Sequence, residues 1–373
     1  MYSNRISTAA RYNLLTSDIQ RNEANYNRLT QQLASGKKIT SITDDPIGAV
    51  NVVNTNRQLG QIETFNKNVA MGMQELSTLD DLMDLAGGYL SQAWNKAVQA
   101  NNQNYGVPAL EALKVEIDEI TKTMVDLANT EFNDNYIFGG ANTKILPYEM
   151  DSDGNIIYKG TPQSNPDYVR KTEVADGVFE VINTTGDKVF GWYDGTKQAQ
   201  DANGNNIFLD KDGKEVIETV DEESGDKSYA YKDGTAYTGN TDELTQKPDY
   251  AGVMGALKLL SDSIQEVVDA KNNNDKDAEQ AGYAKMFSTL DMFDSSLKEI
   301  TTEQTKFGGV YNRLEMTEST LETNNENLTS YLSELQEVDL AKAISDWYQA
   351  QYAYQASLQV AASSMNMSLL NYM

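Results

Sequence analysis

Residues 8–33 read TAARYNLLTSDIQRNEANYNRLTQQL. From Thr8 onward, alternating steps of four and three residues land on Tyr12, Leu15, Ile19, Asn22, Tyr26, Leu29 and Leu33. This alternation is the a/d pattern of a helix that packs along one seam against another helix. The stretch therefore predicts a long amphipathic helix, about 39 Å in length at ~1.5 Å per residue.

The other end of the chain repeats this pattern. The same alternation lands on Leu340, Ile344, Trp347, Gln351, Tyr354, Leu358, Ala361 and Met365. Each stripe covers 26 positions, so the sequence predicts two terminal helices of equal length. A heptad stripe is also found on the buried face of an ordinary core helix. The spacing alone therefore leaves two interpretations open.

The amount of apolar surface favours packing between subunits. The few apolar side chains of the first stripe bury too little surface to offset the conformational entropy lost when the helix becomes ordered. Tyr348 and Tyr352 add a second apolar side to the last helix. We expect both ends to be poorly ordered in the free protein and to fold between subunits. The predicted assembly interface is Tyr12, Leu15, Ile19, Tyr26, Leu29, Leu33, Leu340, Ile344, Trp347, Tyr354, Leu358 and Met365.

Further helices are predicted between the two ends. Asp44 and Asp45 precede Pro46, and an aspartate cap followed by proline at the first helical position is a strong helix start. Pro108 opens another predicted helix, with its apolar stripe at Leu110, Leu113, Ile117, Ile120, Met124 and Leu127. A third stripe runs through Val253, Leu257, Leu260, Ile264 and Val267 and ends near 272–274.

The middle of the chain has a different composition. Residues 141–250 hold four of the 6 prolines and eleven of the 25 glycines. β-branched and aromatic runs at 178–182, 189–193 and 216–220 predict strands. Asp-Gly and Asn-Gly steps supply the positive φ angles of tight hairpin turns. They occur at 153–154, 176–177, 194–195, 203–204, 212–213 and 233–234.

Together these patterns predict a mainly α fold, with a long helical bundle, coiled-coil ends and one inserted antiparallel β domain. The predicted divisions are an N-terminal assembly helix, the first half of a helical rod, the β domain, the second half of the rod and a C-terminal assembly helix. Their ranges are 1–43, 44–144, 145–248, 249–335 and 336–373.

Composition excludes several classes of function. The chain of 373 residues has a formal charge of −26, which argues against a nucleic-acid partner. With no histidine and no cysteine, it has no Ser–His–Asp or Cys–His nucleophile system, Cys/His zinc site or disulfide. The sequence contains no apolar run long enough to span a membrane. Its first twenty residues lack the apolar centre of a cleavable signal peptide.

Two acidic features of the sequence invite interpretation as chemical sites. The turns that begin at Asp151 and Asp210 lack the glycine and glutamate that an EF-hand calcium loop needs at its sixth and twelfth positions. We interpret them as hairpin turns. A carboxylate pair of the kind glycosidases use stays an outside alternative for the β domain, as does a glycan or host-contact patch at Trp192 or Tyr229 and Tyr231. No catalytic, cofactor or metal site is predicted, and the protein is not expected to be an enzyme.

Motifs at both ends resemble a known family. Residues 33–39, LASGKKI, and the following Asp44-Asp45-Pro46 resemble the segment after the first helix of bacterial flagellins and their relatives. Leu340-Ala341, the segment 355–359 (QASLQ) and 368–370 (SLL) resemble the matching C-terminal motif. Filament flagellins and hook–filament junction proteins, the third hook-associated proteins, are the two branches that this resemblance admits.

Three features favour the junction branch. The segment 136–140, YIFGG, with Pro147-Tyr148 after it, resembles the "YxFGG…PF" segment of those proteins. Residues 5–7 and 370–373 resemble their opening motif and their "LNYL" end. This chain departs by Tyr148 in place of phenylalanine, Met373 in place of leucine, and three extra residues at the start. The resemblance covers roughly residues 1–148 and 300–373.

The resemblance implies a structural role. A junction protein joins hook to filament by polymerising in a ring through its paired terminal helices. It is secreted unfolded through the flagellar type III export apparatus, without a cleaved signal, and becomes part of the extracellular flagellum. The implied partners are the first hook-associated protein, flagellin, the filament cap protein and a flagellar export chaperone. Flagellin itself is the alternative function, and a surface-exposed adhesive or enzymatic β module is the outside one.

Overall fold

The chain divides into two compact units. The structure is a computed structural model that describes residues 8–201, 203–210, 214–220, 226–241 and 244–370. One unit is Met1–Asn66 with Ser319–Met373, and the other is Lys67–Glu318. The long helices α2 (Pro46–Ala100) and α6 (Lys276–Gln336) contribute residues to both units.

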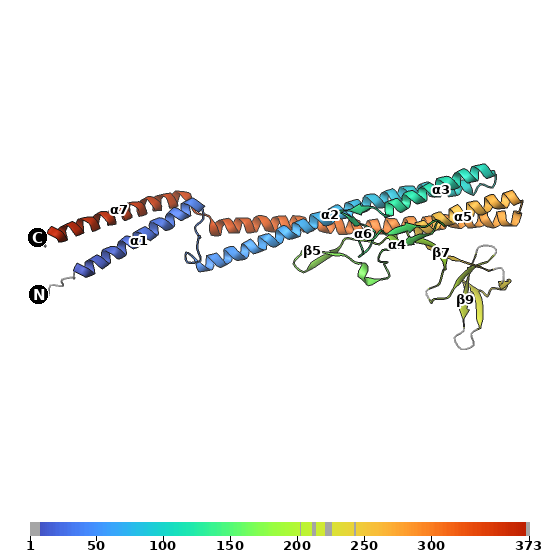
Figure 1. Cartoon of the computed structure of the whole chain (residues 1–373), viewed down its shortest axis with the longest axis horizontal. Helices are drawn as coiled ribbons and strands as arrows, with labels where there is room; N and C mark the ends of the chain where they lie inside the picture. Colours follow the sequence, from blue (N-terminus) through green and yellow to red (C-terminus); the bar gives the residue numbers. More distant parts are fainter. Residues whose placement is uncertain (1–7, 202, 211–213, 221–225, 242–243, 371–373) are drawn as a thin grey trace. The chain divides into compact units, whose positions relative to one another are not determined.

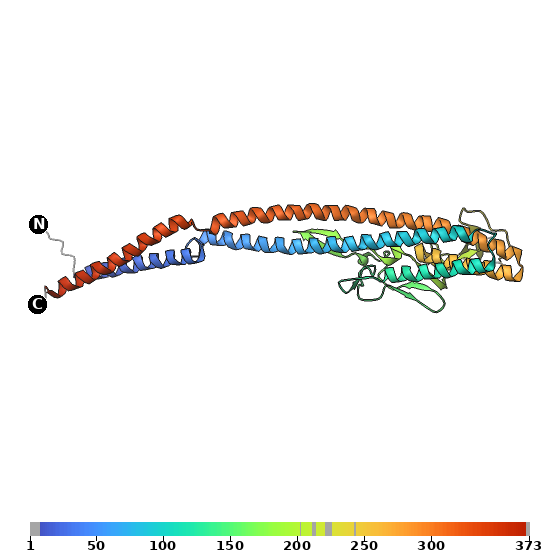
Figure 2. The ribbon, with the colours of Figure 1, turned by 90° about the horizontal axis from the view of Figure 1, so that it is seen from above.

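In the first unit the two ends of the chain form a helix pair. The helices α1 (Thr8–Ser35) and α7 (Leu340–Leu370) lie side by side in both ribbon views (Figures 1 and 2). They run antiparallel, since Asn22 contacts Ala353 while Thr30, later in α1, contacts Trp347, earlier in α7. The two heptad stripes therefore belong to two helices that contact each other.

A short clasp joins the two linkers that lead into this pair. The amide of Lys38 donates to the carbonyl of Gln336 at 2.7 Å, and the amide of Val338 donates to the carbonyl of Gly36 at 3.0 Å. Next to the clasp in sequence, Ile39 packs in a small apolar cluster with Ala49, Val52, Leu332 and Leu335. The linker after α1 and the linker before α7 are thus held together by backbone hydrogen bonds and by apolar contacts.

The helical part of the second unit is formed by α3 (Val107–Ala128) and α5 (Gly252–Asn273), with parts of α2 and α6. The predicted stripe of α5 is confirmed, since all five of its apolar residues are fully buried. In α3 the predicted Leu110, Leu113, Ile117 and Met124 are buried as well. These stripes pack α3 against α5, as helical periodicity predicts.

In the described residues of the same unit, short antiparallel strands form four sheets. Sheet orders are β1-β2, β12-β7-β4-β3, β5-β6 and β10-β9-β8-β11. The strands are β1 (Glu131–Phe132), β2 (Asn135–Tyr136), β3 (Tyr148–Met150), β4 (Ile156–Tyr158), β5 (Lys171–Ala175), β6 (Val178–Val181), β7 (Trp192–Gln198), β8 (Ile207–Leu209), β9 (Glu215–Val220), β10 (Lys227–Tyr231), β11 (Thr245–Gln246) and β12 (Pro248–Ala251). Two short helices, η1 (Pro166–Tyr168) and α4 (Gly186–Val189), lie between them. The predicted fold class, mainly helical with an inserted antiparallel β region, is confirmed.

Polar contacts tie the β region to the helices of its unit. Asn129, just after α3, exchanges two hydrogen bonds with the backbone of Tyr148, at 3.0 and 2.8 Å. The buried hydroxyl of Tyr148 donates to the carbonyl of Gly191 at 2.8 Å. The hydroxyl that distinguishes Tyr148 from a phenylalanine therefore has a hydrogen-bond acceptor. On the β5–β6 hairpin, Glu180 accepts two hydrogen bonds from Arg313 of α6, at 2.9 and 2.6 Å.

Two local predictions in the β region were wrong. Asp194-Gly195 was expected to form a turn, but both residues lie inside β7, where pairing with β12 overrides the local turn preference. Val189 was expected in a strand, but it ends α4, and β7 begins only at Trp192. Glycines 154, 177, 204 and 234 do adopt positive φ angles. The predicted step at 212–213 lies outside the described residues.

No helix in the described part of the chain is long and apolar enough to cross a lipid bilayer.

Gly191, just before β7, lies against the junction between β12 and α5. Its φ is +73°, and an added Cβ would lie 1.9 Å from the carbonyl oxygen of Ala251. We expect Gly191→Ala to lower the free energy of unfolding of the second unit by on the order of 3–5 kcal/mol, because backbone must move. Gly177→Ala is the matched control, since its φ is +69° but its Cβ would meet nothing within 4 Å. It should cost only about 1 kcal/mol. Equal unfolding midpoints for the two variants in a denaturant titration would contradict this packing.

Candidate assembly interface

The predicted interface residues of α1 face its partner helix. Leu29 is buried, and the other predicted residues of this helix are half-buried: Tyr12, Leu15, Ile19, Tyr26 and Leu33. The apolar stripe of α1 is therefore the face that the pair uses.

Aromatic rings form the centre of the pair. The ring of Tyr26 lies 5.7 Å from that of Trp347 and 6.1 Å from that of Tyr354, centroid to centroid. The indole nitrogen of Trp347 donates to the hydroxyl of Thr30 at 2.9 Å. Aromatic pairs at such distances add stabilisation beyond the area they bury. Trp347 and Tyr354 are thus the predicted residues of α7 that contact α1 directly.

Three other residues of the predicted α7 stripe are more exposed than Trp347 and Tyr354. Leu340, Ile344 and Leu358 are 56%, 46% and 44% exposed. The face turned toward α1 instead contains the buried alanines Ala343 and Ala350, between the aromatic residues. Small side chains let two helix backbones approach closely, which explains why α7 presents this face. The side chain of Met365 lies outside the described residues.

The exposed residues of α7 form a second apolar face. Tyr348 and Tyr352 are 51% and 67% exposed. At about 100° of rotation per residue, these two with Leu340, Ile344 and Leu358 are centred roughly 95° around the helix from the α1-facing side. Exposed apolar patches of this kind mark interaction sites. One α1 helix therefore covers only part of the apolar surface of α7.

The first turns of α2 carry another exposed apolar stripe, which was not predicted from the sequence. Ile47, Val50 and Val53 follow one another at steps of three, and their exposed fractions are 77%, 57% and 66%. Ile42, in the preceding linker, is 72% exposed. The spacing of these apolar residues after Pro46 can be read from the sequence and could have predicted this stripe.

The three predicted cap residues have separate roles. Asp45 lies at the N-cap of α2, where its Oδ1 accepts from the amide of Gly48 at 2.9 Å, and Pro46 is the first helical residue. Asp44 orders the linker instead. Its Oδ2 accepts from the amide and hydroxyl of Thr40, at 3.0 and 2.9 Å, and from the amide of Ser41 at 2.8 Å. These hydrogen bonds, those of Thr40 first, hold the pKa of Asp44 below its usual range.

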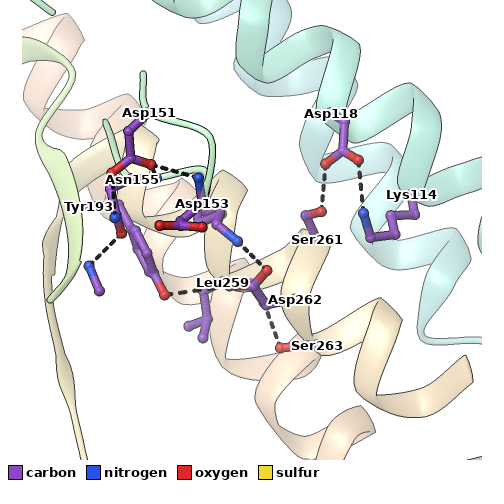
Figure 3. Close-up of polar contacts among 12 residues, drawn as sticks. Lys114, Asp118, Asp151, Asp153, Asn155, Tyr193, Leu259, Ser261, Asp262 and Ser263 are labelled. Atoms are coloured by element: carbon purple, nitrogen blue, oxygen red, sulfur yellow. Dashed lines mark hydrogen bonds and ion pairs between the residues drawn. The ribbon is translucent and has the colours of Figure 1, made fainter. Parts of the chain in front are cut away.

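A polar cleft lies in the second unit (Figure 3). It has a volume of about 290 Å³ and lies where the β3–β4 turn meets α3 and α5. Asp118 accepts from Ser261 at 2.5 Å and from Lys114 at 2.9 Å, and Asp262 pairs with Lys258. The Asp118–Ser261 hydrogen bond joins α3 to α5, and the two lysine contacts, one within each helix, also engage the carboxylates. The cleft is thus a structural joint of the unit.

The turn beside this cleft has the geometry of a hairpin loop. The carboxylate of Asp151 accepts from the amides of Asp153 and Asn155, at 3.0 and 2.8 Å, and from the Asn155 side chain at 2.7 Å (Figure 3). Asp201 makes the same contacts with Asn203 and Asn205. In the part of the chain that the structure describes, no three acidic side chains are grouped so that they would hold a metal ion.

The linker before α2 should respond to acid. Because the pKa of Asp44 is lowered, its hydrogen bonds stabilise the linker at pH values above the ordinary aspartate range. That contribution is lost as the pH falls through the lowered pKa. We expect the amide resonances of Thr40 and Ser41 to titrate below the ordinary aspartate range in NMR spectra. Asp44→Asn should remove this titration, whereas a midpoint at or above the usual value would contradict the assignment.

Comparisons with known proteins point to one family. The model of the bacterial flagellin N-terminal helical region matches residues 6–143. The model of the bacterial flagellin C-terminal helical region matches residues 290–373. The two matches lie at the ends of the chain, where the sequence motifs were found, and leave the β-rich middle unmatched.

Individual relatives extend over nearly the whole chain. Flagellar hook-associated protein 3 of Escherichia coli K12 is 23% identical over 366 residues, which cover 98% of each chain. A flagellin of Clostridium tyrobutyricum is 22% identical over 363 residues, covering 90% of this chain and 93% of the relative.

Solved structures share the fold. The flagellar hook associated protein-3 of Legionella pneumophila superposes with a TM-score of 0.55 at 17% identity, covering 76% of this chain and 98% of that one. FlgL of Xanthomonas campestris superposes with a TM-score of 0.51 at 18% identity, covering 75% and 99%. Since the two matched flagellin regions together span more than half of this sequence, the chain belongs to the bacterial flagellin family.

Proposed function

We propose that this chain is a structural subunit of the bacterial flagellum that joins the hook to the filament. The observation that carries this proposal is the second apolar face of α7, which α1 leaves exposed. A subunit that polymerises needs apolar surface on its helices beyond what its own chain buries. The YxFGG-like segment and the similarity to hook-associated protein 3 along 98% of both chains favour the junction branch of the family.

We infer that the assembly interface combines two sets of residues. The inner set is formed by the α1 residues Tyr12, Leu15, Ile19, Tyr26, Leu29 and Leu33, with Trp347 and Tyr354 of α7. The outer set is formed by Leu340, Ile344 and Leu358, to which we add Tyr348 and Tyr352, and Met365 stays a predicted member. The inner set holds the pair together, and the outer set contacts neighbouring subunits.

The partners and the location follow from this role as proposals. The chain would be secreted through the flagellar export apparatus, with a chaperone before export, and would form a ring in the extracellular flagellum. The first hook-associated protein would lie on one side of the ring, and flagellin with the filament cap protein on the other. The divisions at 1–43, 44–144, 145–248, 249–335 and 336–373 stay predictions, with the first and last segments as the assembly helices.

Flagellin is the second candidate function. It is favoured by the similarity to the Clostridium tyrobutyricum flagellin, which covers 90% of this chain. The two functions differ in how far assembly proceeds, because a filament subunit adds to its own kind without limit and a junction subunit does not.

Seeded assembly separates the two functions. Purified protein is added to hook fragments capped by the first hook-associated protein, and separately to fragments of its own aggregates, and the products are viewed by negative-stain electron microscopy. A junction subunit should extend the hook fragments by a short zone of constant length. Long filaments growing from its own fragments would contradict the junction function and support flagellin.

The outer set can be tested by substitution. Ile344→Asp with Tyr348→Asp removes two apolar side chains, each contributing roughly 1.5 kcal/mol or more when buried, so subunit association should weaken at least ~100-fold. The double variant should keep the helix content of the monomer by circular dichroism, since both residues are exposed there. Gln349→Asp, at an exposed polar position of α7, is the control and should assemble normally. Normal assembly of the double variant would contradict the role of this face.

A further inference from the structure

A chain of four aromatic rings runs through the pair formed by α1 and α7. The ring of Tyr354 stacks on that of Tyr26 at 6.1 Å, centroid to centroid, and Tyr26 lies 5.7 Å from Trp347. Trp347 in turn contacts the ring of Tyr348 at 5.1 Å, in an edge-on arrangement. Rings at these separations are in direct contact. The four rings therefore form a continuous path from the seam between the two helices to Tyr348.

The rings along this path differ in their access to water. Tyr26, Trp347 and Tyr354 are half-buried, whereas Tyr348 is 51% exposed on the outer face of α7. The indole nitrogen of Trp347 donates to the hydroxyl of Thr30 at 2.9 Å, and a hydroxyl is a poor acceptor of the proton itself. Tyr348 is thus the member of the path that gives up its proton to solvent most directly.

The composition of the chain makes this path important for oxidation. The chain has no cysteine, so no thiol competes as the first site of oxidation. Tryptophan and tyrosine are then the side chains that lose a single electron most readily. In the part of the chain that the structure describes, Trp347 is the one tryptophan whose ring contacts tyrosine rings.

The contact between Trp347 and Tyr348 allows an electron to move from one ring to the other. Loss of one electron from Trp347 leaves an indole radical cation. An electron then passes from Tyr348 to Trp347, and the phenol proton of Tyr348 goes to water. Trp347 is restored, and a neutral phenoxyl radical is left on Tyr348. Because the phenol loses its proton in this step, the transfer favours the tyrosine that solvent reaches best.

We propose that Tyr348 is a site of oxidative modification, to which Trp347 passes the oxidising equivalent. The co-reactant is a one-electron oxidant in solution. Phenoxyl radicals from two chains combine by forming a carbon–carbon bond ortho to their oxygens, and the hydrogen at each bonded carbon moves to the oxygen, which gives dityrosine. In total, two electrons and two protons leave the two chains. The proposal depends on the ring contacts of α1 with α7 and not on the flagellar function.

Tyr352 provides an internal comparison on the same face of α7. It is 67% exposed, more than Tyr348, and none of the described residues makes a ring contact with it. If access to the oxidant alone decided the site, Tyr352 would be modified more than Tyr348. Delivery through Trp347 predicts the opposite order.

The test oxidises the full chain in dilute solution and maps the radicals. Tris(bipyridine)ruthenium(III), generated by light, is the oxidant, and a nitroso spin trap converts phenoxyl radicals into stable adducts. Peptide mass spectrometry then compares the adducts at positions 348 and 352. The adduct at Tyr348 should exceed that at Tyr352. Equal amounts, or more adduct at Tyr352, would overturn the proposal.

Variants separate delivery from exposure. Trp347→Phe keeps an aromatic ring that is much harder to oxidise, so the main adduct should shift from Tyr348 to Tyr352. Tyr26→Phe alters the same seam but keeps the indole, and Trp94→Phe removes an indole from the second unit. Both controls should keep Tyr348 as the main site, with the helix content of all three variants checked by circular dichroism.

A second readout follows the product itself. Without the trap and at higher protein concentration, the wild-type chain should form dityrosine, seen by its fluorescence, and Tyr348→Phe should lose most of it. Because Tyr348 is exposed, this variant should keep its fold. Dityrosine that is undiminished in Tyr348→Phe, or an adduct order that Trp347→Phe leaves unchanged, would contradict delivery through Trp347.

Discussion

The structure of the first unit depends on a mismatch of apolar surface between two helices. α7 carries apolar side chains on two adjoining faces, and α1 covers only the one formed by Ala343, Trp347, Ala350 and Tyr354. Each large apolar side chain contributes about 1.5–3 kcal/mol when it is fully buried. Burial of the exposed face of α7 against a neighbouring subunit would therefore contribute a substantial free energy. The contacts of α7 with α1 do not provide it.

The rest of the structure anchors the terminal helices and buries the apolar stripes of the second unit. The clasp between the linkers, with Asp44 and Asp45 ordering the start of α2, joins the two terminal helices to α2 and α6. The second unit buries its own apolar stripes on α3 and α5 and ties its strands to them through Asn129 and Tyr148.

Much of this could be predicted from the sequence where one local rule decides the outcome. The five apolar residues of α5 recur at helical spacing and all are buried, and the Asp45-Pro46 step does begin α2. The orientation of α7 could not be predicted, because alanines at 343 and 350 give little hydrophobic signal and matter through their small size. The turn predicted at Asp194-Gly195 was wrong because the pairing of β7 with β12 outweighs the local preference of these residues for a turn.

The absence of native cysteine allows a direct test of the central claim. A single cysteine at Tyr352, on the exposed face of α7, is labelled with a maleimide in the free protein and in assembled junctions. Lys171→Cys, on β5, provides the reference rate. We expect rapid labelling at position 352 in the free protein and strong protection after assembly, with position 171 reactive in both. Labelling at position 352 that stays rapid in the assembled state would contradict it.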